Sequence, residues 1–240
     1  MNSDTSVQKI NWRQALAEVT LIVAGVLIAL AVDSWWEDKR EREAEISYLE
    51  ALKRDFLTSR ESLESSIKEH QDIINVGDEI LKLINAGLSD ESSGEFFSQF
   101  DNLYQFRTWA PDTGTYDDII NSGRLLYIQN TQLRKELSGF RTTVARIQKY
   151  EILQTETFYE RQAPFLTENR KSNFSWTDEY RSPVSPFIVG IEPFATLEFW
   201  NLVAEWIGVH IDVVSNYRDG IAHCDRILEL IDLELARKRK

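Results

Sequence analysis

The residues best suited to chemistry in this sequence are three histidines and a single cysteine. His70, His210 and His223 are dispersed along the chain, and none has another ligand at the spacing that zinc sites use. Cys224 follows His223 directly, but neighbouring positions on a helix point about 100° apart. The thiol also lacks an identifiable base and orienting group, which a nucleophile needs. These residues therefore predict core or surface positions, and neither a catalytic group nor a metal site.

Acidic residues are the other candidates. Asp112, Asp117 and Asp118 form a local cluster that could take a cation, although capping of a helix N-terminus explains the last two more simply. Glu18 stands at the edge of an apolar segment, where an acid can carry a proton or an ion. The alternative is an acid in the first turn of a membrane helix, stabilised by the helix dipole. The sequence has no glycine-rich phosphate loop, so we expect no cofactor.

The apolar segment over residues 19–32 reads VTLIVAGVLIALAV and carries no charge. Crossing a bilayer takes about 20 residues, so we predict a transmembrane helix over residues 15–36, roughly 33 Å long at 1.5 Å per residue. Trp35 and Trp36 at its end suit an interfacial aromatic belt. A signal peptide cleaved near the Ala29-Leu30-Ala31 triplet and a buried core helix are the alternatives.

One face of the predicted span carries small residues at regular spacing. Small residues let membrane helices approach closely, so this face favours self-association. The alternative is the ordinary alanine and glycine content of a membrane helix. The predicted assembly face consists of Ala17, Leu21, Ala24, Gly25, Ile28, Ala29 and Ala31.

The orientation of the span follows from two opposing rules. Lys9 and Arg13 precede it within the N-terminal flank of residues 1–14, and more lysines and arginines follow it. A count of basic residues places the following domain in the cytoplasm, yet long domains translocate largely regardless of charge. We expect the N-terminus in the cytoplasm and the large domain in the periplasm.

The rest of the chain has the pattern of an all-α protein. Residues 37–87 lack proline and carry apolar residues mostly three, four or seven positions apart, which predicts one amphipathic stalk helix that continues the span and joins the bundle. We expect this helix to end at Gly87 with a left-handed cap. Residues 88–240 are predicted to complete an antiparallel helical bundle with coiled-coil character, apart from an irregular segment over residues 165–193.

Local signals mark further elements within residues 88–240. Thr115 is the predicted N-cap of a helix over residues 115–128, with a break at Gly123, and Pro164 is predicted to stop a helix that opens near Asn130. The last predicted helix begins at Phe194. It is apolar enough to suggest a second span, but a charged acid at a bilayer centre costs about 2.5–3.5 kcal/mol. Because three acids cross its first half, we expect a buried bundle helix.

Charge separates the chain from nucleic-acid-binding proteins. The 240 residues carry a net charge of −12, whereas phosphate binding needs a basic stripe. The exception is a basic tail of Arg237, Lys238, Arg239 and Lys240. If the last helix runs antiparallel to the stalk, the tail returns to the bilayer, where each cation near an anionic surface contributes about 1 kcal/mol. The alternative is a solvated C-terminus whose cations complement the helix dipole.

Two stretches resemble a family of uncharacterised bacterial single-pass proteins, the domain of unknown function 6090 family. In residues 17–56, the places of the family's pattern are taken by Glu18, Gly25, residues 27–30, Trp35 and the Tyr48-Leu49 pair. Asp33-Ser34 replaces a pair of asparagines, so no role of those amides carries over. Residues 114–140 are similar to a second family segment at Thr115, Tyr116, Ser122 and Gly123. The resemblance implies this architecture and a bacterial origin, but no activity.

These observations lead to three functional expectations. The leading one is a non-enzymatic, membrane-anchored helical scaffold or accessory subunit of a membrane protein assembly, with the lipid bilayer and either further copies or other membrane subunits as partners. A periplasmic sensor with a ligand pocket under residues 165–193 is the second. A proton-coupled, stator-like subunit that uses Glu18 is the third.

Overall fold

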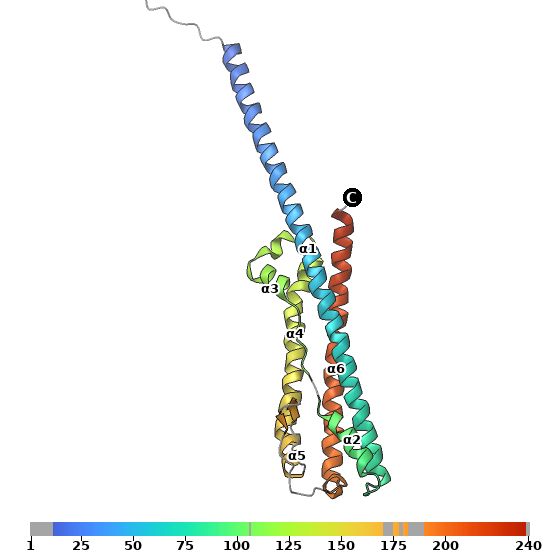
Figure 1. Cartoon of the computed structure of the whole chain (residues 1–240). Helices are drawn as coiled ribbons and strands as arrows, with labels where there is room; N and C mark the ends of the chain where they lie inside the picture. The colour runs from blue at the N-terminus through green and yellow to red at the C-terminus, as the bar shows by residue number, and fades with distance from the viewer. Residues whose placement is uncertain (1–11, 106, 170–174, 178–179, 182–189, 239–240) are drawn as a thin grey trace, which may run out of the picture. The chain divides into compact units, whose positions relative to one another are not determined.

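The computed structural model describes residues 12–105, 107–169, 175–177, 180–181 and 190–238. The chain forms two compact units, Met1–Leu49 and Glu50–Lys240, which are described separately below as unit 1 and unit 2. Its long helices are α1 (Trp12–Ala86), α4 (Thr131–Thr157) and α6 (Leu197–Lys238) (Figure 1). The predicted all-α fold class is confirmed.

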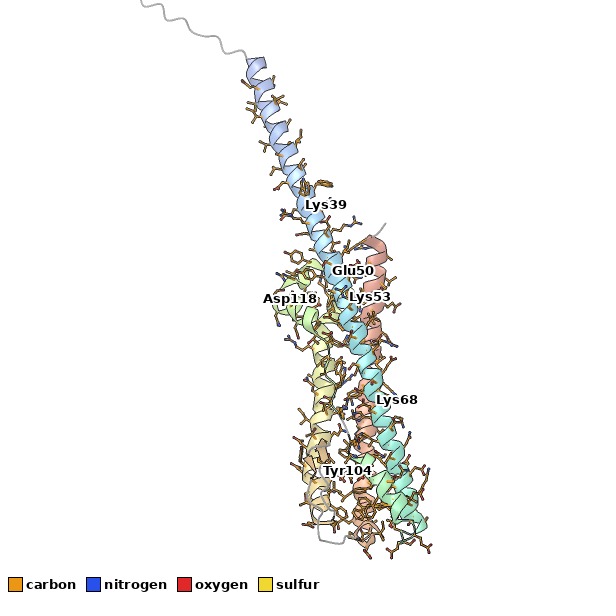
Figure 2. All side chains as sticks on the ribbon, viewed as in Figure 1. Lys39, Glu50, Lys53, Lys68, Tyr104 and Asp118 are labelled. Carbon is orange, nitrogen blue, oxygen red and sulfur yellow. The ribbon has the colours of Figure 1, made fainter. Side chains whose placement is uncertain are left out.

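The described part of unit 1 is the N-terminal portion of α1. Leucine, alanine and other good helix formers fill this portion, and it contains no proline. Its large apolar side chains between Leu16 and Val32 are exposed, with Leu21 at 76% and Ile28 at 65% of full exposure. Figure 2 shows side chains projecting on all sides of this helix. The segment therefore has no core of its own within unit 1.

Unit 2 is organised around α6, which runs antiparallel to both other long helices (Figure 1). Contacts with α1 run from Lys53 and Asp232 at one end to Gly77 and Ile207 at the other. The contact between Asn130 and Glu234 fixes the same antiparallel sense for α4 and α6. These three helices form the antiparallel bundle predicted from the sequence, and the apolar first half of α6 is part of its core.

Shorter elements close unit 2. They are α2 (Ser93–Leu103), α3 (Gly114–Asn121), a 3-10 turn η1 (Arg124–Tyr127), a π-helical turn η2 (Phe158–Gln162), α5 (Ala163–Asn169), a 3-10 turn η3 (Glu192–Phe194), and a hairpin of β1 (Ser175–Thr177) and β2 (Tyr180–Arg181). The two strands pair antiparallel, with Ser175 opposite Arg181. The hairpin lies inside the segment predicted to be irregular.

Aromatic side chains from α2, α5, η3 and α6 form the densest part of the core. Phe165 stacks on Phe199 with ring centroids 5.3 Å apart, and Phe96 meets Phe194 at the same separation. Each such pair adds about 0.5–1.5 kcal/mol beyond the burial of its area. This cluster joins the two ends of the predicted irregular segment, because Phe165 is its first residue and Phe194 directly follows it. The segment's interior, residues 170–174, 178–179 and 182–189, lies outside the described residues.

Two helix ends were predicted correctly from local signals. α1 ends at Ala86, and Gly87 follows with a φ of 93° and donates its N–H to the Ile84 carbonyl. Asn130 is the N-cap of α4, because its side-chain oxygen accepts a hydrogen bond from the Leu133 N–H at 2.9 Å.

Other boundaries differ from the prediction. Pro164 does not stop the helix, because η2 absorbs one extra residue and Pro164 then falls in the first turn of α5, where no N–H is needed. Thr115 is not an N-cap, because α3 begins at Gly114 and Thr113 precedes it. The last helix begins at Leu197 rather than Phe194, which belongs to η3.

Candidate functional site

The apolar portion of α1 is the first candidate site. Within the described residues, α1 is the one helix long and apolar enough to cross a membrane, and none of its most apolar window is buried. The predicted assembly-face residues are all exposed, and a Cβ placed on Gly25 would meet nothing within 4 Å. Glu18 is exposed as well. The face is therefore open to lipid or to another helix.

Tryptophans mark the end of this apolar portion. Trp35 and Trp36 meet edge to face, with ring centroids 5.6 Å apart. The Lys39 ammonium lies 5.8 Å and 5.5 Å from the two ring centroids, within cation–π range. Rings with an apolar body and a neighbouring cation are typical of a boundary between hydrocarbon and water.

The second candidate is a buried polar cluster in unit 2, at the level where α1, α4 and α6 meet. His70 and His210 touch through their Nδ1 atoms at 2.8 Å, although 140 residues separate them in the sequence. His70 Nε2 lies 3.2 Å from the Arg107 carbonyl oxygen, and His210 Nε2 lies 3.1 Å from Gln154 Nε2. The side chains of His70, His210 and Gln154 are almost fully buried.

The partners determine where the hydrogens lie. A carbonyl oxygen only accepts, so His70 Nε2 carries a hydrogen and His70 Nδ1 accepts from His210 Nδ1. His210 Nε2 then has a free lone pair, which accepts from the amide N–H of Gln154. The result is a directed chain of three hydrogen bonds through two neutral imidazoles. Burial lowers the pKa of His70, and burial and the neighbouring His70 lower the pKa of His210 to about 3.

A carboxylate lies beside this histidine pair. Glu151, one helical turn before Gln154 on α4, accepts hydrogen bonds through the same oxygen from the Trp109 backbone N–H at 2.6 Å and from the Tyr217 hydroxyl at 2.5 Å. The Tyr217 ring packs edge to face on His70, with centroids 5.4 Å apart. Burial and Glu151 raise the pKa of Tyr217. Glu151 therefore serves as an acceptor that ties the Trp109 backbone to two helices.

The third histidine has a separate environment. His223 Nδ1 lies 2.8 Å from the Thr143 hydroxyl, and its Nε2 donates to the Glu136 backbone oxygen at 3.1 Å. Burial and the neighbouring Arg226 lower the pKa of His223. Cys224 is fully buried, and burial raises the pKa of its thiol to about 12. At neutral pH this thiol is protonated and shielded from reagents.

The predicted acidic cluster divides among different partners. Asp118 pairs with Arg124 at 3.0 Å, Asp117 accepts from the Thr113 hydroxyl at 2.7 Å, and the Asp112 backbone bonds to the Ser59 hydroxyl. Within the residues that the structure describes, no group of three histidine, cysteine, aspartate or glutamate side chains could hold a metal ion.

The family-like patch has structural contacts. Tyr116 is buried and packs edge to face on Phe56 and Phe140, while the Thr115 N–H donates to Asp55 at 2.7 Å. Ser122 donates its N–H to the Asp118 carbonyl, and Gly123 has a φ of 74° that turns the chain into η1. In the basic tail, Arg237 pairs with Glu234 at 3.0 Å; Arg239 and Lys240 lie outside the described residues.

A surface groove opens beside the buried cluster. It has a volume of about 520 Å³ and is lined by Glu69, Asp72, Ile73 and Val76 of α1 together with Asn102, Gln105 and Arg107. Arg107, one of these lining residues, also accepts the hydrogen bond from His70 through its backbone carbonyl.

The pairing of His70 with His210 is the feature that reasoning from the sequence missed. Both histidines stand in the apolar register of their helices, seven residues from Leu63 and from Val203 respectively. A histidine at a core position must find a hydrogen-bond partner. Two histidines at core positions of two amphipathic helices therefore indicated that each needs a buried partner. Only the register between the two helices shows that they are partners of each other.

Comparison with known proteins assigns a family. The model of a family of unknown function, DUF6090, matches residues 18–169. This range includes the apolar portion of α1 and also His70, Trp109 and Glu151. No curated protein and no solved structure matches the chain.

Proposed function

The chain belongs to the family of unknown function DUF6090, and we propose that it is a non-enzymatic, membrane-anchored scaffold or accessory subunit of a membrane protein assembly. The observation that carries this proposal is the exposed apolar surface of α1. Ten large apolar side chains between Leu16 and Val32 are each at least half exposed. Such a surface needs a partner that removes it from water.

The magnitude of this exposure argues for lipid as that partner. Burying one large apolar side chain is worth about 1.5–3 kcal/mol, so ten of them represent roughly 15–30 kcal/mol. A whole domain is stable by only about 5–15 kcal/mol. The segment is also the length of a bilayer span and ends in the Trp35 and Trp36 pair, which suits a headgroup boundary.

The position of the large domain is part of the proposal. The N-terminus lies in the cytoplasm of a bacterial inner membrane, and unit 2 lies in the periplasm, because a short basic flank before a first span stays inside. A topology tag fused to each terminus, and labelled from one side of the membrane at a time, checks this orientation. Labelling of a C-terminal tag from the cytoplasmic side alone would contradict it.

A scaffold or accessory role is favoured over catalysis by how unit 2 uses its polar groups. The buried histidines and Glu151 are engaged with one another and with the backbone, and burial keeps the Cys224 thiol protonated. Each of these groups therefore has a role in the fold, and none is an activated nucleophile.

The test is the mass and composition of the particle extracted from native membranes in mild detergent. Homo-oligomers or co-purifying membrane subunits support the proposal, and a soluble monomer released without detergent contradicts it. Gly25→Ile, on the assembly face, is expected to reduce the mass of a homo-oligomer. Val26→Ile, one position away and off that face, is the matched control and leaves the mass unchanged.

A further inference from the structure

We propose that the contact between His70 and His210 is a proton-sensitive latch, which holds the backbone at Arg107 against the bundle when both rings are neutral and releases it when the rings become charged. This inference goes beyond the proposed function and does not depend on it, because every group involved lies in unit 2.

The geometry of the pair admits a single hydrogen. The two Nδ1 atoms are 2.8 Å apart, a distance at which one nitrogen donates and the other accepts. A proton added to His70 would place two N–H groups face to face, because a charged imidazole donates from both nitrogens. A proton added at His210 Nε2 would meet the N–H of Gln154, which lies 3.1 Å away. A charged His70 therefore breaks the hydrogen bond between the two rings, and a charged His210 requires the Gln154 amide to turn its unpartnered Oε1 toward Nε2.

Burial lowers the pKa of His70 more than the Arg107 carbonyl and the neighbouring Glu69 carboxylate raise it. His70 is flanked on α1 by Glu69, which lines the open groove, and it faces the Arg107 carbonyl, the Tyr217 ring from α6 and His210. From α6, the Trp206 ring packs on His210 with centroids 4.6 Å apart, and α4 adds the neutral amide of Gln154. The nearby carboxylate on α4 belongs to Glu151. Its Oε1 atom already accepts hydrogen bonds from the Trp109 N–H and the Tyr217 hydroxyl.

The histidine pair is connected to a segment that can move. Residues 107–113 directly precede α3 in the connection from α2, and they have no helix or strand of their own. The anchors of this segment include His70 at the Arg107 carbonyl, Glu151 at the Trp109 N–H, and Ser59 at the Asp112 backbone. Loss of the first anchor, together with rotation of the His70 ring, frees the start of the segment and the groove wall at Arg107.

The size of the effect follows from proton linkage. In an open state with solvated rings, each histidine has a pKa near its ordinary value of about 6.5. At about pH 5.0 each ring then favours the charged form by about 30-fold, and the two together shift the equilibrium toward the open state by about 1,000-fold. At about pH 7.5 this driving force is absent, so the latch is closed.

Hydrogen exchange of the full chain in detergent micelles tests the latch. The protein is labelled at about pH 7.5 and about pH 5.0, and rates are corrected for the intrinsic pH dependence of exchange. We expect the peptide covering residues 107–113 to lose protection at the lower pH by at least tenfold, while the core of α4 keeps its protection. Unchanged protection of residues 107–113 at the lower pH overturns the proposal.

Two variants distinguish the latch from a general loosening of the fold at low pH. His70→Gln with His210→Gln removes both titrating groups, so we expect protection of residues 107–113 to become independent of pH. His223→Gln removes the one other histidine and is the matched control, which keeps the wild-type response. A pH response that persists in the double variant, or that disappears in the control, refutes the latch.

A further measurement covers the case in which the double variant does not fold. With only three histidines, ring NMR signals of histidine-labelled wild-type protein are few enough to follow through a pH titration. We expect two rings to gain protons together, over the same pH range in which residues 107–113 lose protection. Two rings that stay neutral while those residues open would contradict the proposal.

Discussion

Gly77 of α1 and Ile207 of α6 are in such close contact that a Cβ on the glycine would lie 2.6 Å from Ile207 Cγ1. At this point the Ile207 side chain packs directly on the backbone of α1, where Gly77 has no side chain. Glycine inside a helix costs roughly 1 kcal/mol relative to alanine, and here that cost is offset by close packing of the helices.

Gly77→Ala is therefore expected to destabilise unit 2. The new methyl group overpacks a tight contact at a cost of about 1–3 kcal/mol, which exceeds the gain of about 1 kcal/mol in helix propensity. The free energy of unfolding from a denaturant titration measures the balance. Gly208→Ala on α6, where a Cβ meets nothing within 4 Å, is the matched control and is expected to stabilise the helix. Equal effects of the two substitutions would contradict this account of the contact.

The stability of unit 2 should depend on pH through its histidines. Burial lowers the pKa of His70, and the pKa of His210 is lowered to about 3. The unfolded chain, with a histidine pKa of about 6.5, binds more protons between about pH 3 and 6.5, so stability rises with pH in that window. We expect a loss of up to about 1.4 kcal/mol per pH unit per histidine as the pH falls below about 6. Urea titrations at several pH values measure it, and the loss stops growing at the pH where the latch opens, because the rings are then charged in the folded protein as well. Stability that does not fall at all between pH 7 and the pH of opening would contradict it.

Glu151 should be more important for stability than a single hydrogen bond suggests. Glu151→Leu leaves the Trp109 N–H and the Tyr217 hydroxyl without their acceptor in a buried site, at a cost of about 1–3 kcal/mol for each group. Glu151→Gln keeps an oxygen at the same place and is expected to cost less. Tyr217→Phe removes one of the two donors and should cost about 1 kcal/mol. Thermal unfolding of the three variants gives the order, and a Glu151→Leu protein as stable as wild type would show that these donors find other acceptors.

Cys224 is expected to react with thiol reagents only after unit 2 opens. Its side chain is fully buried, and burial raises the pKa of the thiol to about 12, so the reactive thiolate is scarce at neutral pH. The rate of modification by a maleimide at pH 7 should rise by orders of magnitude when denaturant is added. Rapid labelling of the native protein would contradict the burial of this thiol.

Glu18→Gln tests the proton-carrier alternative. The side chain is exposed on α1 near the start of the apolar portion, which suits a headgroup position. We expect the variant to assemble with wild-type mass and to complement a strain that lacks the gene. Loss of complementation with assembly intact would favour a stator-like role for this acid.

Local sequence was sufficient for features that depend on neighbouring residues. The long apolar helix, the Asn130 cap and the left-handed Gly87 all follow from the type and order of residues along the chain, because an apolar run, a cap and a tight turn are local features. The all-α class follows in the same way from apolar spacings of three and four.

Features that depend on the relative positions of whole helices required the tertiary structure. Pro164 is tolerated because a π-helical turn shifts the register before it, and no residue near the proline signals that turn. His70 and His210 meet because α1 and α6 run antiparallel at one particular register, which is set by the sum of contacts from Lys53 to Ile207. The sequence by itself determined which helices form and which segment avoids water; the tertiary structure decided that two histidines 140 residues apart share one hydrogen, because only helix packing brings their rings together.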